Sequence, residues 1–528
     1  MSARHWRRII PVLLPSWAAL AFLAATFFAA LAGGGVTPAL AGPAACSESG
    51  GVATCTGNQS QGIQSGVDFS AGDTILNVPS VSGSITPPVD TNGILFSGAT
   101  TVEINSNVSN IVINGYGDGI LGTAPGAVDI DHSGNIYDAF RGINGFSINN
   151  DVTITDRGVI DNATEAAING YAPNGSVTIG LHGRITDAQN RGISGVAATT
   201  SGTGTVSITS NANIDAVNQA IYGLSVGGTT ISSIGNLTSE SSRGISAEAS
   251  GGIASIDSAG DVESADTSLY ARSTGGNASA TSHGDVTSHT NTGIDVESTV
   301  GTATINSNGD ISAANQGLFA YGATGASITS DGDVTTGSTG NDAIFAFSNS
   351  GPASVTSHGD INAPNGRGAV AITSGGAASV DSDGSVTAKG DAVYAMGGSA
   401  TVTQYGDVSS TQANGISAYG SSGAVSITGT GDVTAHVNGI AAYTGGTGNA
   451  TIDHTGDVTA TGGQGVRAQT ASGTASVVQN GDVTATATNG VVAYSGNGSA
   501  SAAVTGNVQS GGNGIEVDST AGNATITG

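Results

Sequence analysis

The sequence predicts an all-β fold, a right-handed parallel β-helix of about 16 or more three-stranded coils with roughly 25 residues per coil. Three observations predict it. A glycine recurs at a nearly constant interval, each interval holds three short apolar segments, and glycine, serine, threonine or asparagine separates the segments. Such a period is typical of a solenoid, in which each unit buries its apolar face only against its neighbours.

The repeat is clearest from Gly431 to Thr455, which reads GDVTAHVNGIAAYTGGTGNATIDHT. Its leading glycine recurs from Gly134 onward, and Ala212 takes this place once. The interval between leading positions ranges from 22 to 29 residues, and the last five copies are 25 residues apart: Gly406, Gly431, Gly456, Gly481 and Gly506. The even spacing leaves no room for a long excursion from the coil.

Each unit contains three segments of about five residues, long enough for a strand and too short for a helix. In the clearest unit they centre on Val433, on Ile440 with Ala442, and on Ile452. Residues before each segment are mostly Gly, Asp or Asn, which tolerate a sharp corner. Alternation predicts that the following residues point inward and stack: Val433, Val458 and Val483 in the first strand, Ile440, Val466 and Val491 in the second, and Ile427, Ile452 and Val477 in the third.

The first 45 residues are predicted to be a signal peptide. Arg4, Arg7 and Arg8 give a basic start, an apolar run follows, and Ala39-Leu40-Ala41 offers a small-x-small cleavage site. An uncleaved membrane anchor is the alternative, because the apolar run is nearly long enough to span a bilayer. Residues 46–133 repeat less cleanly and are predicted to form an N-terminal cap with irregular first coils, while residues 134–528 form the regular helix.

The expected export of the chain indicates the redox state of its two cysteines. In an oxidising compartment Cys46 and Cys55 are expected to form a disulfide that closes a loop over the N-terminal end of the helix. Loss of the three signal arginines leaves nine basic residues against 39 acidic ones, a net charge near −30. Nucleic acid and anionic lipid are therefore excluded as partners.

The segment ACSESGGVATCTGNQSQGI, from Ala45 to Ile63, follows a long signal and precedes Gly-Asp-Val coils. It resembles the N-terminus of an autotransporter passenger, the secreted β-helix of type V secretion. The resemblance implies export to the bacterial cell surface or outer membrane, or secretion. Such proteins end in an outer-membrane barrel, whereas this chain stops at Gly528 inside a coil. We therefore expect a fragment whose barrel is missing, with membrane contact only through that barrel.

The aspartate after the leading glycine is the candidate metal ligand. Stacked at ~4.8 Å, such carboxylates would repel one another by of order 1 kcal/mol per pair in water, and calcium would relieve the repulsion. Alternatively, each aspartate caps its own corner by accepting a backbone N–H. This second interpretation predicts no metal and no cofactor, and the calcium candidates are Asp432, Asp457 and Asp482.

The remaining polar residues predict no catalytic site. The histidines that precede the leading glycine recur by register, which indicates corner residues: His132, His182, His283, His358 and His454. Long loops that could build a cleft are absent from the repeat, and neither a Gly-Asp-Ser-Gly nucleophile motif nor a phosphate-binding glycine loop with a Gly-Lys-Ser/Thr ending occurs. An enzyme acting on polysaccharide and a calcium-stabilised matrix protein remain the alternatives. An ice-binding rod would need a flat Thr-x-Thr face, while the threonines of the first segment form a single row.

Aromatic residues concentrate in the second segment from residue 260 onward. Alternation directs five of them outward, which predicts a binding stripe on one wall: Tyr321, Phe347, Tyr419, Tyr443 and Tyr494. Tyrosine combines an apolar ring with a polar tip and suits a sugar or protein partner, although the rings could also stack only on one another. The sequence therefore predicts an exported β-helical adhesin or interaction stalk without enzymatic activity, whose partner is a host-cell or matrix protein or a glycan.

Overall fold

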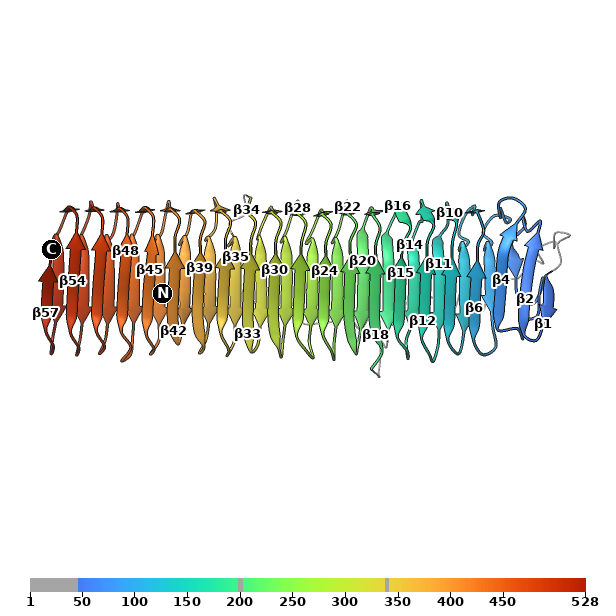
Figure 1. Ribbon diagram of the computed structural model, residues 1–528, viewed down its shortest axis with the longest axis horizontal. Helices are drawn as coiled ribbons and strands as arrows, with labels where there is room; N and C mark the ends of the chain where they lie inside the picture. Colours follow the sequence, from blue (N-terminus) through green and yellow to red (C-terminus); the bar gives the residue numbers. More distant parts are fainter. Residues whose placement is uncertain (1–45, 198–202, 338–340) are drawn as a thin grey trace. The chain divides into compact units, whose positions relative to one another are not determined.

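The computed structural model describes residues 46–197, 203–337 and 341–528. Within these ranges the chain is all-β, has no helix, and forms a parallel β-solenoid of about 19 turns with about 25 residues per turn (Figure 1). The predicted fold class is confirmed. The predicted signal peptide, residues 1–45, lies outside the described residues, and the division at residue 134 stays a prediction.

Three sheets form the walls of the solenoid, one for each predicted segment. Sheet 1 contains the short first strands, from β7 (Asn110–Val112) to β55 (Val508–Ser510). Sheet 2 contains the second strands, from β3 (Ile63–Gln64) to β56 (Ile515–Ser519), and sheet 3 is a 21-stranded sheet that ends at β57 (Ala524–Thr527). Within each wall, a strand pairs in parallel with its counterpart in the next coil (Figure 1).

The unit from Gly431 to Thr455 shows how the sequence folds locally. Its strands are β46 (Val433–Ala435), β47 (Ile440–Thr444) and β48 (Ala450–Thr455), in the three predicted places. Equivalent repeat positions pair across coils, so that Val433 faces Val458, Ile440 faces Val466 and Ile452 faces Val477. The sequence repeat is therefore also the hydrogen-bond register.

The core is a set of continuous apolar columns inside the three walls. Val433, Ile440 and Ile452 are at most 1% exposed, and buried residues alternate with more exposed ones in β46 and β48, while Ala441 of β47 is also buried. Burial of each such side chain contributes about 1.5–3 kcal/mol relative to exposure. The predicted inward stacks are confirmed along the regular coils.

The N-terminal end differs from the regular coils. Strand β1 (Ser47–Ser49) runs antiparallel to β2 (Val52–Gly57), and the predicted disulfide joins Cys46 to Cys55 across this hairpin. Cys55 is fully buried against the first coils. The pairing of β2 with β4 (Ile75–Val81) shifts register between Thr54 and Thr56. This end is therefore capped by a hairpin, which occupies the edge that the first coil would otherwise expose.

The corner geometry favours glycine at the leading position. Gly456 has a φ of +139°, and a Cβ at this residue would lie 2.3 Å from the carbonyl oxygen of Gly431, one coil earlier. A side chain would be strained by the backbone conformation and would also collide with the neighbouring backbone. Gly375 is a useful contrast, since a Cβ there meets open space.

We expect Gly456→Ala to lower the free energy of unfolding by roughly 2–3 kcal/mol, because both the strain and the collision must be relieved. Gly375→Ala is the matched control, with an expected change near zero. Urea unfolding followed by circular dichroism measures both. Equal effects of the two substitutions would contradict the role assigned to the leading glycine.

Candidate functional site

The outer wall of sheet 2 carries an apolar patch that runs over six consecutive coils. Two outward positions, the second and fourth residues of each strand, contribute to it. The strands are β32 (Leu318–Gly322), β35 (Ile344–Ser348), β38 (Ala369–Thr373), β41 (Val393–Gly397), β44 (Ile416–Gly420) and β47. We call the patch the aromatic platform; its members are Phe319, Tyr321, Phe345, Phe347, Ile372, Tyr394, Met396, Tyr419 and Tyr443.

Rings on neighbouring coils stack on one another. The ring centroids of Tyr321 and Phe347 are 5.7 Å apart with planes 7° from parallel, and those of Tyr419 and Tyr443 are 5.2 Å apart with planes 8° from parallel. These side chains are half-buried. Burial raises the pKa of Tyr419 to about 12, so its hydroxyl group stays neutral at physiological pH.

Two arginines lie against the platform rings. The Arg367 guanidinium carbon is 5.6 Å from the Phe345 centroid and 5.4 Å from the Tyr394 centroid. The Arg467 guanidinium carbon is 5.0 Å from the Tyr443 centroid. Arg367 also makes a bidentate pair with Asp342, with bonds of 2.8 and 2.6 Å. Cation–π contacts and this ion pair hold the long side chains in place along the margin of the platform.

The five predicted stripe residues occupy equivalent outward positions on different coils of the same wall, and we call such a row of equivalent positions a file. Four of them belong to the platform, whereas Tyr494 on β53 (Val491–Ser495) is separated from Tyr443 by Gln469. Their assignment as a binding face stays a prediction. The aliphatic members Ile372 and Met396 were missed because only aromatic residues were considered; the fourth residue of every second segment is the signal that identifies them.

An earlier stack on the same wall was also missed. Phe146 and Tyr171, on β11 (Arg141–Ser147) and β14 (Ala166–Ala172), have ring centroids 5.5 Å apart and planes 11° from parallel. They precede the region after residue 260 in which the aromatic pattern was recognised. They lie in the same file of outward positions, and this position in the repeat is the sequence signal that identifies them.

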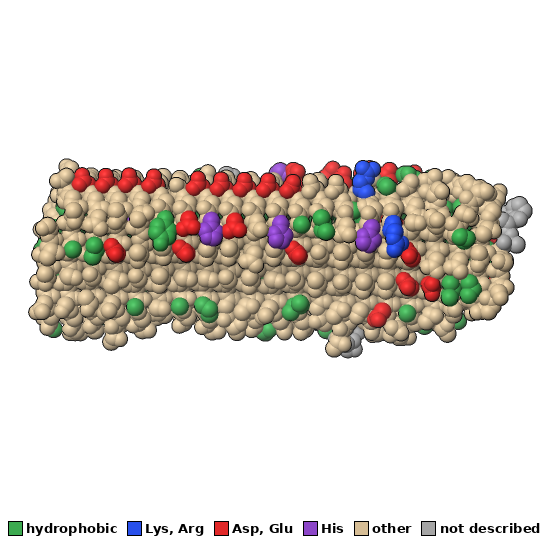
Figure 2. All heavy atoms as spheres, viewed as in Figure 1, with side chains coloured by type: hydrophobic (Ala, Val, Ile, Leu, Met, Phe, Trp, Pro, Cys, Tyr) green, Lys and Arg blue, Asp and Glu red, His purple; other side chains and the backbone are tan. Residues whose placement is uncertain are grey.

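The outer wall of sheet 3 is polar, and Figure 2 shows it as a broad surface almost free of large apolar side chains. One outward file holds only serine and threonine from Thr153 to Thr525. Paired positions such as Thr401 and Thr403 occur here, so the single threonine row inferred from the first segment is incomplete. Several hydroxyl groups bond to their counterpart one coil away, as Ser354 does to Ser327 at 3.0 Å.

The aspartates after the leading glycine form an exposed row along one edge of sheet 1 (Figure 2). The backbone N–H of Asp457 donates to Oδ1 of Asp432 at 2.9 Å, and that of Asp482 donates to Oδ1 of Asp457 at 2.8 Å. Each calcium candidate thus accepts an N–H from the next coil, not from its own corner. Among the described residues, no group of three or more His, Cys, Asp or Glu side chains could hold a metal ion.

The histidines divide by their distance from the leading glycine. His182, His283 and His358 directly precede it and point outward, and His358 lies 2.8 Å from Asp331 and 3.6 Å from Asp383. His132 and His454, one residue earlier, point into the bore and are at most 1% exposed. In each group, the distance from the leading glycine decides whether the histidine side chain points outward or into the bore.

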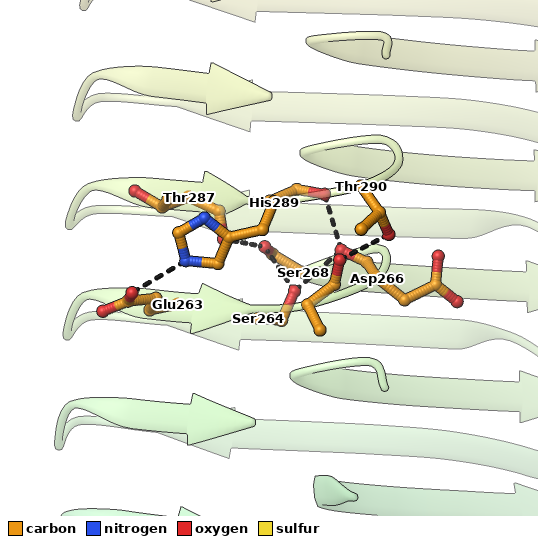
Figure 3. A network of polar contacts seen from close by, with 9 residues as sticks. Glu263, Ser264, Asp266, Ser268, Thr287, His289 and Thr290 are labelled. Atoms are coloured by element: carbon orange, nitrogen blue, oxygen red, sulfur yellow. Dashed lines mark hydrogen bonds and ion pairs between the residues drawn. The ribbon is translucent and has the colours of Figure 1, made fainter. Parts of the chain in front are cut away.

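Other corners hold their polar groups in bonds within a coil and between coils (Figure 3). Ser264 donates to the backbone carbonyl of Asp266 at 2.8 Å, and Ser268 donates to a carbonyl of the following coil at 2.7 Å. His289 lies 2.8 Å from Glu263 on the preceding coil. These side chains close corners, and their hydroxyl groups are engaged in structural hydrogen bonds.

One buried column departs from the pattern of the core. Ser106, His132 and Asp156 face one another in register on three successive coils, and each points into the bore. Desolvation lowers the pKa of His132 to about 4 and raises the pKa of Asp156 to about 7. The residue types are those of a nucleophilic triad, but their side chains point into the bore, where Ser106 is 4% exposed and His132 and Asp156 are fully buried.

A shallow groove opens on the outer wall of sheet 3 in the first coils, and its lining is Thr54, Asn77, Pro79, Asn105, Ser106, Asn107, Asp131, Ser133 and Arg157. The carboxylate in this lining, Asp131, forms an ion pair with Arg157. Glycoside hydrolysis requires two carboxyl groups that flank the scissile bond. The groove does not supply that pair.

No family model matches the chain, and no curated protein or solved structure matches it. Within the described residues, no helix has the length and apolar character needed to cross a membrane.

The buried column predicts opposite pH responses for two substitutions. His132 has a lower pKa in the folded chain than its ordinary 6.5, so its contribution to stability is lost as pH falls from 6.5 to about 4. Asp156 has a higher folded pKa than its ordinary 3.8, so its contribution is lost as pH rises from 3.8 to about 7.

Relative to the wild type, we therefore expect His132→Ser to gain unfolding free energy as pH falls from 7 to 4, and Asp156→Ser to lose it. Serine is the residue that most coils carry at this position, so both substitutions restore the repeat. Urea unfolding across this pH range measures the difference in unfolding free energy between each variant and the wild type. The contributions of the other titrating groups cancel in this difference. Curves that stay parallel to the wild type would rule out titration of the column.

The aspartate row predicts a difference between two substitutions at one position. Asp457→Asn keeps the Oδ1 acceptor and is expected to leave stability unchanged or slightly raised, because one repulsive charge is removed. Asp457→Ala loses the acceptor and should cost about 1 kcal/mol. Thermal unfolding measures both, and millimolar calcium should leave the wild-type melting temperature unchanged; a large calcium-dependent rise that Asp457→Asn abolishes would instead establish a metal site.

Proposed function

We propose that the chain is an exported β-helical stalk of the bacterial cell surface, which acts as an adhesin or interaction surface and catalyses no reaction. The observation that carries the proposal is the aromatic platform. It places nine apolar side chains, most of them aromatic, together on one wall of a solenoid whose sheet 3 wall is polar. Aromatic side chains are enriched at protein interfaces, where tyrosine combines an apolar ring with a polar tip.

The solenoid would present the aromatic platform to a partner. About 19 turns at the strand spacing of ~4.8 Å give a rod of roughly 90 Å. Every strand is hydrogen-bonded to the next coil along three walls, which makes the rod stiff. Such a rod would hold the platform away from the membrane, where a host-cell or matrix protein or a glycan can reach it.

Charge and chemistry support this role. The net charge of −27 disfavours nucleic acid and anionic membranes as partners. The N-terminal disulfide fits an oxidising compartment outside the cytoplasm. Tyrosine and arginine, which are enriched at protein interfaces, gather on the sheet 2 wall.

The proposal is tested with beads that carry residues 46–528, applied to surfaces coated with extracellular-matrix proteins or with glycans. We expect retention on at least one surface, and a loss of retention with the double variant Phe347→Thr, Tyr419→Thr. Threonine keeps the strand preference of these positions and removes the rings.

Tyr405→Thr is the matched control, because Tyr405 is 52% exposed and lies outside sheet 2. Circular dichroism verifies that each variant keeps the wild-type fold. Retention on no surface, or equal retention of the double variant and the control, would refute an adhesive role for the platform.

A further inference from the structure

In two pairs of platform rings, each ring covers one face of its partner. Tyr321 and Phe347 stack with planes 7° apart, and Ile372 follows Phe347 in register on the next coil. Glu297 precedes Tyr321 in the same file. Each ring of this pair therefore has one face against its partner, and a residue of the neighbouring coil lies in register on the other side.

The second stack is closed in the same way. Tyr419 and Tyr443 stack with planes 8° apart, Met396 precedes Tyr419 in register, and the Arg467 guanidinium lies over the Tyr443 ring at 5.0 Å. A sugar that binds an aromatic residue lays its C–H groups on a free ring face, where the π-system is negative. These rings instead present edges and hydroxyl tips to the solvent, together with the thioether of Met396, which is 37% exposed.

The size of the platform limits its ligand. Six strands at ~4.8 Å spacing and two outward positions per strand give a strip of roughly 25 by 10 Å, or roughly 250 Å². A stable interface between globular proteins buries about 800 Å² on each partner. The strip is too narrow for such an interface and matches the width of one extended polypeptide, of which roughly eight residues would cover its length.

Charge defines the sequence that would bind. The platform members are uncharged. At the margin, Asp342 pairs with Arg367. Arg467 bonds to Gln464 and Gln469 and keeps its positive charge. The whole chain carries a net charge of −27. An apolar segment flanked by lysine or arginine is therefore attracted, and one flanked by acidic residues is repelled.

We propose that the aromatic platform binds an extended, apolar polypeptide segment with basic flanks, laid along the rod, and does not bind sugar rings. This inference rests on the proposed function and names its ligand class. Aromatic edges and aliphatic groups contact apolar side chains of the segment, and the polar strips beside the platform remain in water. A contact of this area is weak for a single rod, and many rods on one cell would strengthen it through multivalency.

The test measures fluorescence anisotropy with residues 46–528 and labelled ten-residue peptides. The probe alternates valine with threonine and carries two lysines at each end. Two control peptides replace the valines by serine or the lysines by glutamate. Linear oligosaccharides of glucose and of N-acetylglucosamine form the glycan arm.

We expect the lysine-flanked valine peptide to bind, both control peptides to bind more weakly, and the oligosaccharides not to bind. Tyr419→Thr should weaken peptide binding roughly tenfold. Met396→Ser is a second variant, since its side chain is the most exposed of the platform and contributes least to packing. Tyr405→Thr should leave binding unchanged.

Three outcomes would overturn the inference. Oligosaccharide binding that Tyr419→Thr abolishes would keep the proposed function and replace the ligand class. Peptide binding that neither platform variant weakens would place the site elsewhere. Failure of every peptide would reject the polypeptide ligand, while retention in the bead assay separately decides whether the platform is adhesive.

Discussion

The structure depends on one constraint, the in-register hydrogen bonding of each coil to the next. Val433, Val458 and Val483 pair at equivalent repeat positions, and the same holds for the second and third segments. Because the register is preserved, every position of the repeat becomes a file of side chains about 4.8 Å apart. Whether a residue type is stable at a given position therefore depends on how its side chain interacts with the equivalent side chains of the neighbouring coils.

Stacking has a different consequence for each kind of residue. Valine and isoleucine columns fill the bore, and rings such as Tyr419 and Tyr443 stack face to face. Carboxylates repel in this arrangement, yet the aspartate row persists because each Oδ1 accepts the backbone N–H of the next coil. The row keeps the corners together at the cost of a modest repulsion that water and salt screen.

Residues that differ from the usual type in their file fall into two kinds, those in the bore and those on an outer wall. His132 and Asp156 replace the usual serine in the bore, where burial opposes their charged forms, so they affect stability and not recognition. Platform residues such as Phe345 and Met396 lie on an outer wall, where they can meet a partner. An unusual residue is thus structural or functional according to the side of the wall on which it lies.

The sequence by itself determined the solenoid, its period, the inward columns at Val433, Ile440 and Ile452, and the disulfide of Cys46 with Cys55, because these follow from local alternation and from the repeat. It also directed Tyr321 and Phe347 outward. Only the tertiary structure decided that Ile372 and Met396 complete a platform with them, that rings of neighbouring coils stack face to face, and that Asp432 accepts a hydrogen bond from the next coil. Those facts depend on distances between residues about 25 positions apart, which register and side-chain packing create and which local pattern does not contain.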